Sequence, residues 1–126
     1  MKALNVIGTA YRGTLEEQDD TIVWITHAMK GAGADLDVLL RRSAVNYASK
    51  AQEVPALSFG DRRQKNSPHI AQDVAGLIGK DIAVYIIEED IAEHGLADGD
   101  LIEGLTRVKR ADVPRLLDGY DHIWAW

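Results

Sequence analysis

The sequence contains no cysteine among its 126 residues. A chain without a thiol forms no disulfide, offers no thiolate to zinc and has no sulfur nucleophile. Thiolate catalysis and the carriage of a persulfide by this chain alone are therefore excluded.

The sequence also lacks a basic excess and any long apolar run. Lysine and arginine total 14 against 20 acidic residues, which gives a net charge of −6. This balance argues against nucleic acid or an anionic membrane as the main partner. The apolar runs are too short to span a bilayer, and the first residues, interrupted by Asn5, are too short for the core of a signal peptide. We therefore expect a cytoplasmic protein.

The composition is that of an ordinary globular protein, with 46% hydrophobic and 27% charged residues. A length of 126 residues is typical of one domain and too short for two well-packed ones. We expect a single domain spanning residues 1–126.

Apolar segments alternate with helical patterns along the chain. Strands are predicted at residues 3–7, 35–40, 82–87, 105–108 and 122–126. Helices are predicted at residues 14–30, from a capping box of Thr14 and Glu17, at residues 67–79, from a Ser67 cap, and at residues 112–117. The alternation predicts an α/β fold, a three-layer α/β/α sandwich with a mostly parallel sheet of about five strands.

The segment between residues 43 and 66 is ambiguous. Residues 43–51 are compatible with a short helix that Pro55 ends, and residues 60–66 are predicted to be an exposed polar loop. The loop carries Arg62, Arg63 and Lys65, which would suit an acidic protein partner but are also typical of a solvated loop.

Several familiar sites are absent. The sequence has no Walker loop, no Gly-x-Gly-x-x-Gly and no Gly-x-Ser-x-Gly nucleophile elbow. The four histidines lie on four different predicted elements, and the one spacing of note, His69 with Asp73, is more typical of a solvated contact along a helix than of a metal site. No catalytic residue, metal site or cofactor is predicted.

The remaining candidates follow from position in the fold. Ligands of open α/β sheets bind beyond the carboxyl ends of the strands. At those ends lie Thr9, Tyr11, Arg12, Arg41, Arg42, Asn46, Tyr47, Glu89 and Asp90. Two arginines facing carboxylates can bind an anion or a zwitterion. The alternative is mutual ion pairing on a solvated rim, which is the more common role of exposed charges.

The tryptophans are candidates for packing or assembly. Trp24 lies beside the apolar positions Ile22 and Ile25 and is expected in or near the core. Trp124 and Trp126 alternate on the last predicted strand, so both face the same side. Such a pair indicates core packing or a subunit interface, where tryptophan is enriched.

Two parts of the chain resemble a family. Residues 84–96, with Val84-Tyr85, Glu89-Asp90 and Gly95-Leu96, resemble the Val-Tyr…Glu-Asp…Arg-Gly-Leu segment of the DsrH/TusB proteins, as do residues 108–117 and Trp126. Residues 27–40 are similar to the DsrE/DsrF branch. Both branches belong to the DsrE/DsrF/DsrH-like (TusB/TusC/TusD-like) superfamily of small sulfur-relay proteins.

The resemblance implies homo-oligomers or mixed hexamers that relay persulfide sulfur, with the sulfur on a cysteine after the second strand of DsrE-type subunits. This chain has no cysteine there, and the hydroxyl of Ser58 or Ser67 cannot replace a thiolate at neutral pH. His94 also stands where arginine is usual.

These departures favour a non-catalytic, cysteine-free subunit over an enzyme. We expect it to act through assembly, as a homo-oligomer or with a cysteine-bearing homologue, within intracellular sulfur relay. The alternative is a small-molecule binding protein, or an enzyme, that uses the strand-end residues to hold an anion or a zwitterion.

Overall fold

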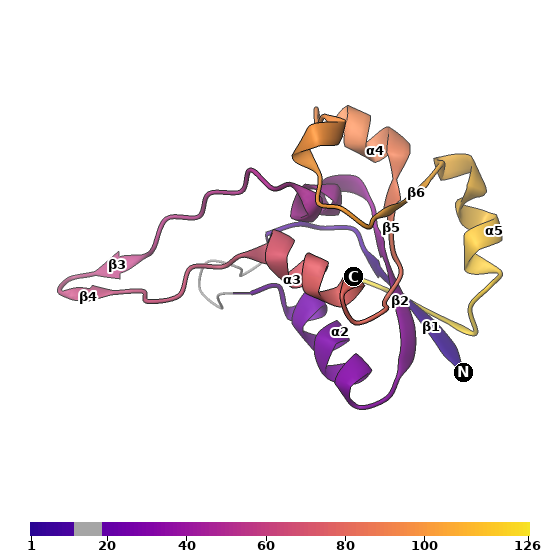
Figure 1. Ribbon diagram of the computed structural model, residues 1–126, viewed down its shortest axis with the longest axis horizontal. Coiled ribbons are helices and arrows are strands. Elements are labelled where there is room, and N and C mark those ends of the chain that lie inside the picture. Colours follow the sequence, from indigo (N-terminus) through magenta and orange to yellow (C-terminus); the bar gives the residue numbers. More distant parts are fainter. Residues whose placement is uncertain (12–18) are drawn as a thin grey trace.

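The computed structural model describes residues 1–11 and 19–126. Its centre is a five-stranded sheet with the strand order β6-β5-β2-β1-β7 (Figure 1). The strands are β1 (Lys2–Ile7), β2 (Asp35–Leu40), β5 (Val84–Ile87), β6 (Thr106–Val108) and β7 (His122–Ala125). Every neighbouring pair is parallel. The predicted α/β sandwich with a mostly parallel sheet is confirmed.

Helices flank the sheet. They are α2 (Thr21–Gly31), α3 (Ile70–Ile78), α4 (Glu88–Glu93) and α5 (Val113–Leu117), with 3-10 turns η1 (Arg42–Ala48), η2 (Asp98–Asp100) and η3 (Arg110–Asp112). Helices α2 and α3 lie on one side of the sheet and α5 lies on the other (Figure 1). Within residues 1–11 and 19–126, no helix combines the length and apolarity needed to cross a membrane.

Strand β2 shows why the sheet is covered on both faces. Val38 and Leu40 belong to the larger core with α2, α3 and η1, whereas Leu39 belongs to the smaller core beneath α5. All three side chains are at most 1% exposed. Successive strand residues point to opposite faces, and each fully buried side chain of this size contributes about 1.5–3 kcal/mol. The run of apolar residues is thus explained by burial on both sides.

Both long helices begin later than the sequence signals indicated. Helix α2 begins at Thr21, and the buried carboxylate of Asp20 caps it by accepting the backbone N–H groups of Ile22 at 2.9 Å and Val23 at 3.0 Å. The predicted capping box at residues 14–17 lies outside the described residues. Helix α3 begins at Ile70 rather than at residues 67–68, because His69 has non-helical dihedral angles of φ −130° and ψ 65°.

Trp24 is not in or near the core, contrary to the expectation. It is 56% exposed, and its neighbour Ile25 is 36% exposed. Helix α2 turns a polar residue inward instead: the hydroxyl of Thr26 is fully buried and accepts a hydrogen bond of 2.9 Å from the Asn5 side chain of β1. This bond orients the helix, and it leaves the indole on the outer face.

Trp124 and Trp126 lie on one face of the edge strand β7, as predicted. Trp124 pairs with Asn5 of β1, and the Trp126 indole N–H lies 3.5 Å from the Asn5 side-chain oxygen. Both tryptophans are therefore on the side of the sheet that α2 covers. Trp124 is half-buried, whereas Trp126 is 48% exposed.

The predicted polar loop at residues 60–66 contains a hairpin. Strands β3 (Ser58–Phe59) and β4 (Arg62–Arg63) pair antiparallel across a two-residue turn. The turn requires a positive φ at its first residue, and Gly60 supplies it with φ +57°. The hairpin stands far out from the sheet and helices (Figure 1). Residues 57–65 are called the arm below.

Candidate functional site

A cavity of about 520 Å³ opens at the carboxyl ends of β2 and β5. Its lining residues are Arg41, Arg42, Ile87, Asp90, Glu93, Arg110, Val113 and Pro114. We call it the rim pocket. Three of the predicted strand-end residues, Arg41, Arg42 and Asp90, are brought together here.

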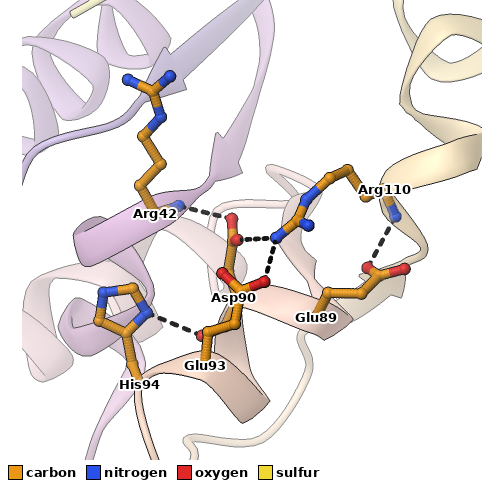
Figure 2. Close-up of polar contacts among 6 residues, drawn as sticks. All are labelled: Arg42, Glu89, Asp90, Glu93, His94 and Arg110. Carbon is orange, nitrogen blue, oxygen red and sulfur yellow. Dashed lines mark hydrogen bonds and ion pairs between the residues drawn. The ribbon is translucent and has the colours of Figure 1, made fainter.

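Asp90 is the centre of the polar contacts (Figure 2). Its side chain is buried, and its carboxylate accepts hydrogen bonds of 2.6 Å from the backbone N–H of Arg42 and from the guanidinium of Arg110. The same guanidinium nitrogen pairs with Glu93 at 3.0 Å. Burial raises the pKa of Asp90, but the bonds from Arg42 and Arg110 lower it by more, and the net pKa lies below its usual range.

These contacts hold a strained turn. Arg42, the first residue of η1, has φ +51°, a left-handed conformation that costs roughly 1–2 kcal/mol for a residue other than glycine. Its N–H points at the charged Asp90 carboxylate, and a bond to a charged acceptor is stronger than a neutral one. The Asp90 carboxylate therefore fixes how the chain leaves β2.

Glu89 acts beside the pocket rather than in it. Its carboxylate accepts a hydrogen bond of 2.8 Å from the backbone N–H of Arg110, which lowers the pKa of Glu89 (Figure 2). Together Glu89, Asp90 and Glu93 of α4 hold Arg110 in place at the start of η3, and Asp90 and Glu93 raise the pKa of its guanidinium.

Arg41 and Arg42 form no salt bridge with any residue in the described part of the chain. Arg41 is half-buried, and its Nε is buried without a hydrogen-bond partner among residues 1–11 and 19–126. The guanidinium of Arg42 is exposed and points away from the Asp90 contacts (Figure 2). Three arginines thus line the pocket with two acidic residues, Asp90 and Glu93, and the formal net charge of the lining residues is +1. The charge of the pocket is therefore opposite in sign to the net charge of the whole chain, which is −6.

Tyr47 is not a surface residue of this rim. Its side chain is fully buried, and its hydroxyl donates to the Asp20 carboxylate at 2.6 Å while accepting the backbone N–H of Tyr11 at 2.7 Å. Burial, and then the bond to Asp20, raise the pKa of Tyr47. Tyr47 therefore ties η1 to the start of α2 and to the segment after β1.

The other strand-end candidates do not line the pocket. Thr9 and Tyr11 are exposed, and the Tyr11 ring contacts the Tyr47 ring edge to face at 5.4 Å between centroids. The side-chain amide of Asn46 donates to the carbonyl of Ser43 at 3.0 Å, so it closes its own turn. Arg12 lies outside the described residues.

Two charged pocket residues, Arg110 and Glu93, were missed in the sequence. Arg110 follows β6 by two residues, so the rule that selected the ends of the other strands would have found it. Glu93 lies three residues after Asp90 on α4, and residues at this spacing share one face of a helix. Among residues 1–11 and 19–126, no group of three or more potential ligands is placed to hold a metal ion.

No protein-family model and no curated protein sequence matches the chain. Among solved structures, it is similar to the ychN protein from E. coli, with a TM-score of 0.72 and 14% identity over 100% of both chains. It is also similar to MTH1491 from Methanobacterium thermoautotrophicum, a protein of unknown function, with a TM-score of 0.65 and 14% identity over 98% of this chain and 97% of that one. The chain thus shares the α/β fold of these two proteins along its length.

Proposed function

We propose that this protein is a non-catalytic binding protein that holds a small anion in the rim pocket. The observation that carries the proposal is the half-buried Arg41, which forms no salt bridge with the described residues and lines a pocket of net positive charge. Guanidinium groups match the geometry of carboxylate and phosphate, so an anion in this pocket would supply Arg41 with the charged partner that it lacks among the described residues.

The ligand would meet Arg41, because Arg110 is already engaged by Asp90 and Glu93 and the Arg42 guanidinium points away from those contacts (Figure 2). The cavity, at about 520 Å³, is within the range of small-molecule sites, roughly 300–1,000 Å³. Glu93 remains 58% exposed, so its carboxylate is available to an ammonium group. A zwitterion such as an amino acid is therefore the second ligand class to test.

Isothermal titration calorimetry with phosphate, sulfate, acetate and glycine tests the proposal. We expect at least one of these probes to bind, and we expect Arg41→Met to weaken that binding at least tenfold. Lys80→Met is the matched control, since it removes the same charge from an exposed position after α3. Absence of binding by all four probes, or an equal loss in both variants, would contradict the proposal.

A second candidate function is assembly, and the edge strand β7 favours it. Its outer edge pairs with no strand in the described part of the chain, and Ile123 and Trp126 are 41% and 48% exposed. Proteins rarely leave such an edge uncovered. In this role the chain is a DsrE/DsrH-like subunit, either with copies of itself or with a cysteine-bearing homologue.

Light scattering coupled to size-exclusion chromatography at micromolar concentration tests assembly. We expect a mass above that of one chain. Trp126→Ala is expected to weaken the oligomer more than Trp24→Ala, because Trp24 is similarly exposed but lies on α2. A mass of one chain would rule out self-assembly.

A part in sulfur relay requires a partner that supplies the thiol. We propose that this protein acts in the cytoplasm. The isolated chain has no group that accepts sulfane sulfur. Its mass is therefore expected to stay unchanged after incubation with a persulfide donor. A covalent gain of one sulfur atom would overturn this argument.

A further inference from the structure

The arm is a part of the described chain that the sheet and the helices do not cover (Figure 1). Strands β3 and β4 pair with each other and with no other described strand. Two hydrogen bonds between Leu57 and Gln64, of 2.8 and 3.2 Å, continue the hairpin toward the body. Phe59, at the tip, is 73% exposed. An isolated two-stranded hairpin is marginally stable in water, and an exposed phenylalanine there contributes nothing to its own core.

The charge of the arm is opposite to that of the remaining chain. Arg62, Arg63 and Lys65 outweigh Asp61, which gives residues 57–65 a net charge of +2. The whole chain carries −6, so all residues outside the arm together carry −8. The arm points away from its own body (Figure 1). Its charges are therefore placed to meet an acidic surface of another molecule.

We propose that the arm docks on the acidic body of a second copy of this chain, with Phe59 as its apolar anchor. This inference rests on the assembly proposed above and names the surface that makes it. Under two-fold symmetry each copy gives one arm and receives one, so the favourable contact occurs twice. The contact between the basic arm and the acidic body is locally attractive, although two chains of net charge −6 repel one another at longer range, and salt screens both effects.

Sedimentation velocity at low and high salt tests the proposal with charge variants. We expect Arg62→Ala/Arg63→Ala to raise the dissociation constant at least tenfold at about 50 mM salt, and we expect this difference from the wild type to shrink at about 500 mM salt. The control Lys109→Ala/Arg115→Ala removes the same charge from exposed positions of the body and is expected to change the constant less than twofold. Both positions in each variant are exposed, so far-UV circular dichroism spectra should match the wild type and show that the variants are folded.

The absence of cysteine allows a second measurement. Ser58→Cys creates a unique site for a spin label on the arm, and we expect narrow spectral lines at dilution and broad lines once the protein associates. If the protein associates while the label stays mobile and the arm variant behaves like wild type, the arm does not dock and assembly through β7 still stands. A wild type that remains a single chain at all concentrations would overturn both.

Discussion

Replacing Tyr120 with phenylalanine removes one of the hydrogen-bond donors to the buried carboxylate of Asp37. This carboxylate joins four segments of the chain. Asp37, on β2, is 5% exposed and accepts hydrogen bonds from the Tyr120 hydroxyl at 2.6 Å and the backbone N–H of Ala83 at 2.9 Å. It also pairs with the Lys2 ammonium of β1 at 2.9 Å. Tyr120 follows α5, so the bond anchors that helix to the amino-terminal edge of the sheet.

The expected cost of Tyr120→Phe is about 1.5–3 kcal/mol, the net value of a hydrogen bond to a charged group. For a chain of 126 residues, an unfolding entropy of about 2.1 cal/mol/K per residue makes 1 kcal/mol equivalent to roughly 4 °C. The melting temperature at pH 7 is therefore expected to fall by about 6–12 °C. Urea unfolding at the same pH gives the free energy directly.

The pH dependence provides the stricter test. Burial raises the pKa of Asp37, but the bonds from Tyr120, Lys2 and Ala83 lower it by more, so the folded pKa lies below the unfolded value. The stabilisation is then complete above the unfolded pKa of about 3.9 and is lost as the pH falls through the folded pKa. The gap between wild type and Tyr120→Phe should narrow over that range.

Tyr11→Phe is the matched control, because this tyrosine is 47% exposed, and its substitution should stay within about 0.5 kcal/mol. A fall of less than about 2 °C for Tyr120→Phe, or a gap that does not narrow as the pH falls through the folded pKa of Asp37, would refute the role given to the Asp37 carboxylate.

Four further substitutions test other contacts. Tyr47→Phe leaves a buried oxygen of Asp20 without its donor and should lower the free energy of unfolding by about 1–3 kcal/mol in urea. Asp90→Ala is expected to lower the melting temperature clearly, whereas Arg41→Ala should leave it near wild type. A large fall for Arg41→Ala with little change for Asp90→Ala would reverse the structural role given to Asp90 and the binding role given to Arg41. Gly104→Ala should destabilise by about 1–3 kcal/mol in thermal melts, because φ is +84° and a Cβ would lie 2.8 Å from an isoleucine methyl; unchanged stability would contradict this strain.

Much of the sheet could be predicted because burial on both faces leaves an uninterrupted apolar run, and residues 82–87 predicted the strand that is found at Val84–Ile87. The orientation of α2 could not. Its inward side includes Thr26, whose burial depends on a hydrogen bond to Asn5 of another element. A hydrophobicity pattern counts such a threonine as polar. For this reason the sequence predicted Trp24, rather than Thr26, in or near the core.

The candidate site was predictable where only strand order mattered. Arg41, Arg42 and Asp90 meet because β2 and β5 are parallel neighbours, so their carboxyl ends share one edge. The direction of a side chain within η1 depends on packing instead. Tyr47 has an apolar ring and a polar hydroxyl, and its burial is decided by the Asp20 carboxylate, which lies 27 residues earlier in the chain.

The position of β7 has a consequence for synthesis on the ribosome. Strand β1 lies between β2 and β7. One edge of β1 can pair once β2 has been made, whereas the other edge stays unpaired until β7, near residue 122, has been made. At translation rates of roughly 5–20 residues per second, the segment between β2 and β7 takes roughly 4–16 s to make. During that interval the nascent chain presents an open strand edge, which is a template for pairing with neighbouring chains. A chaperone that covers this edge would therefore act mainly before His122–Ala125 emerge.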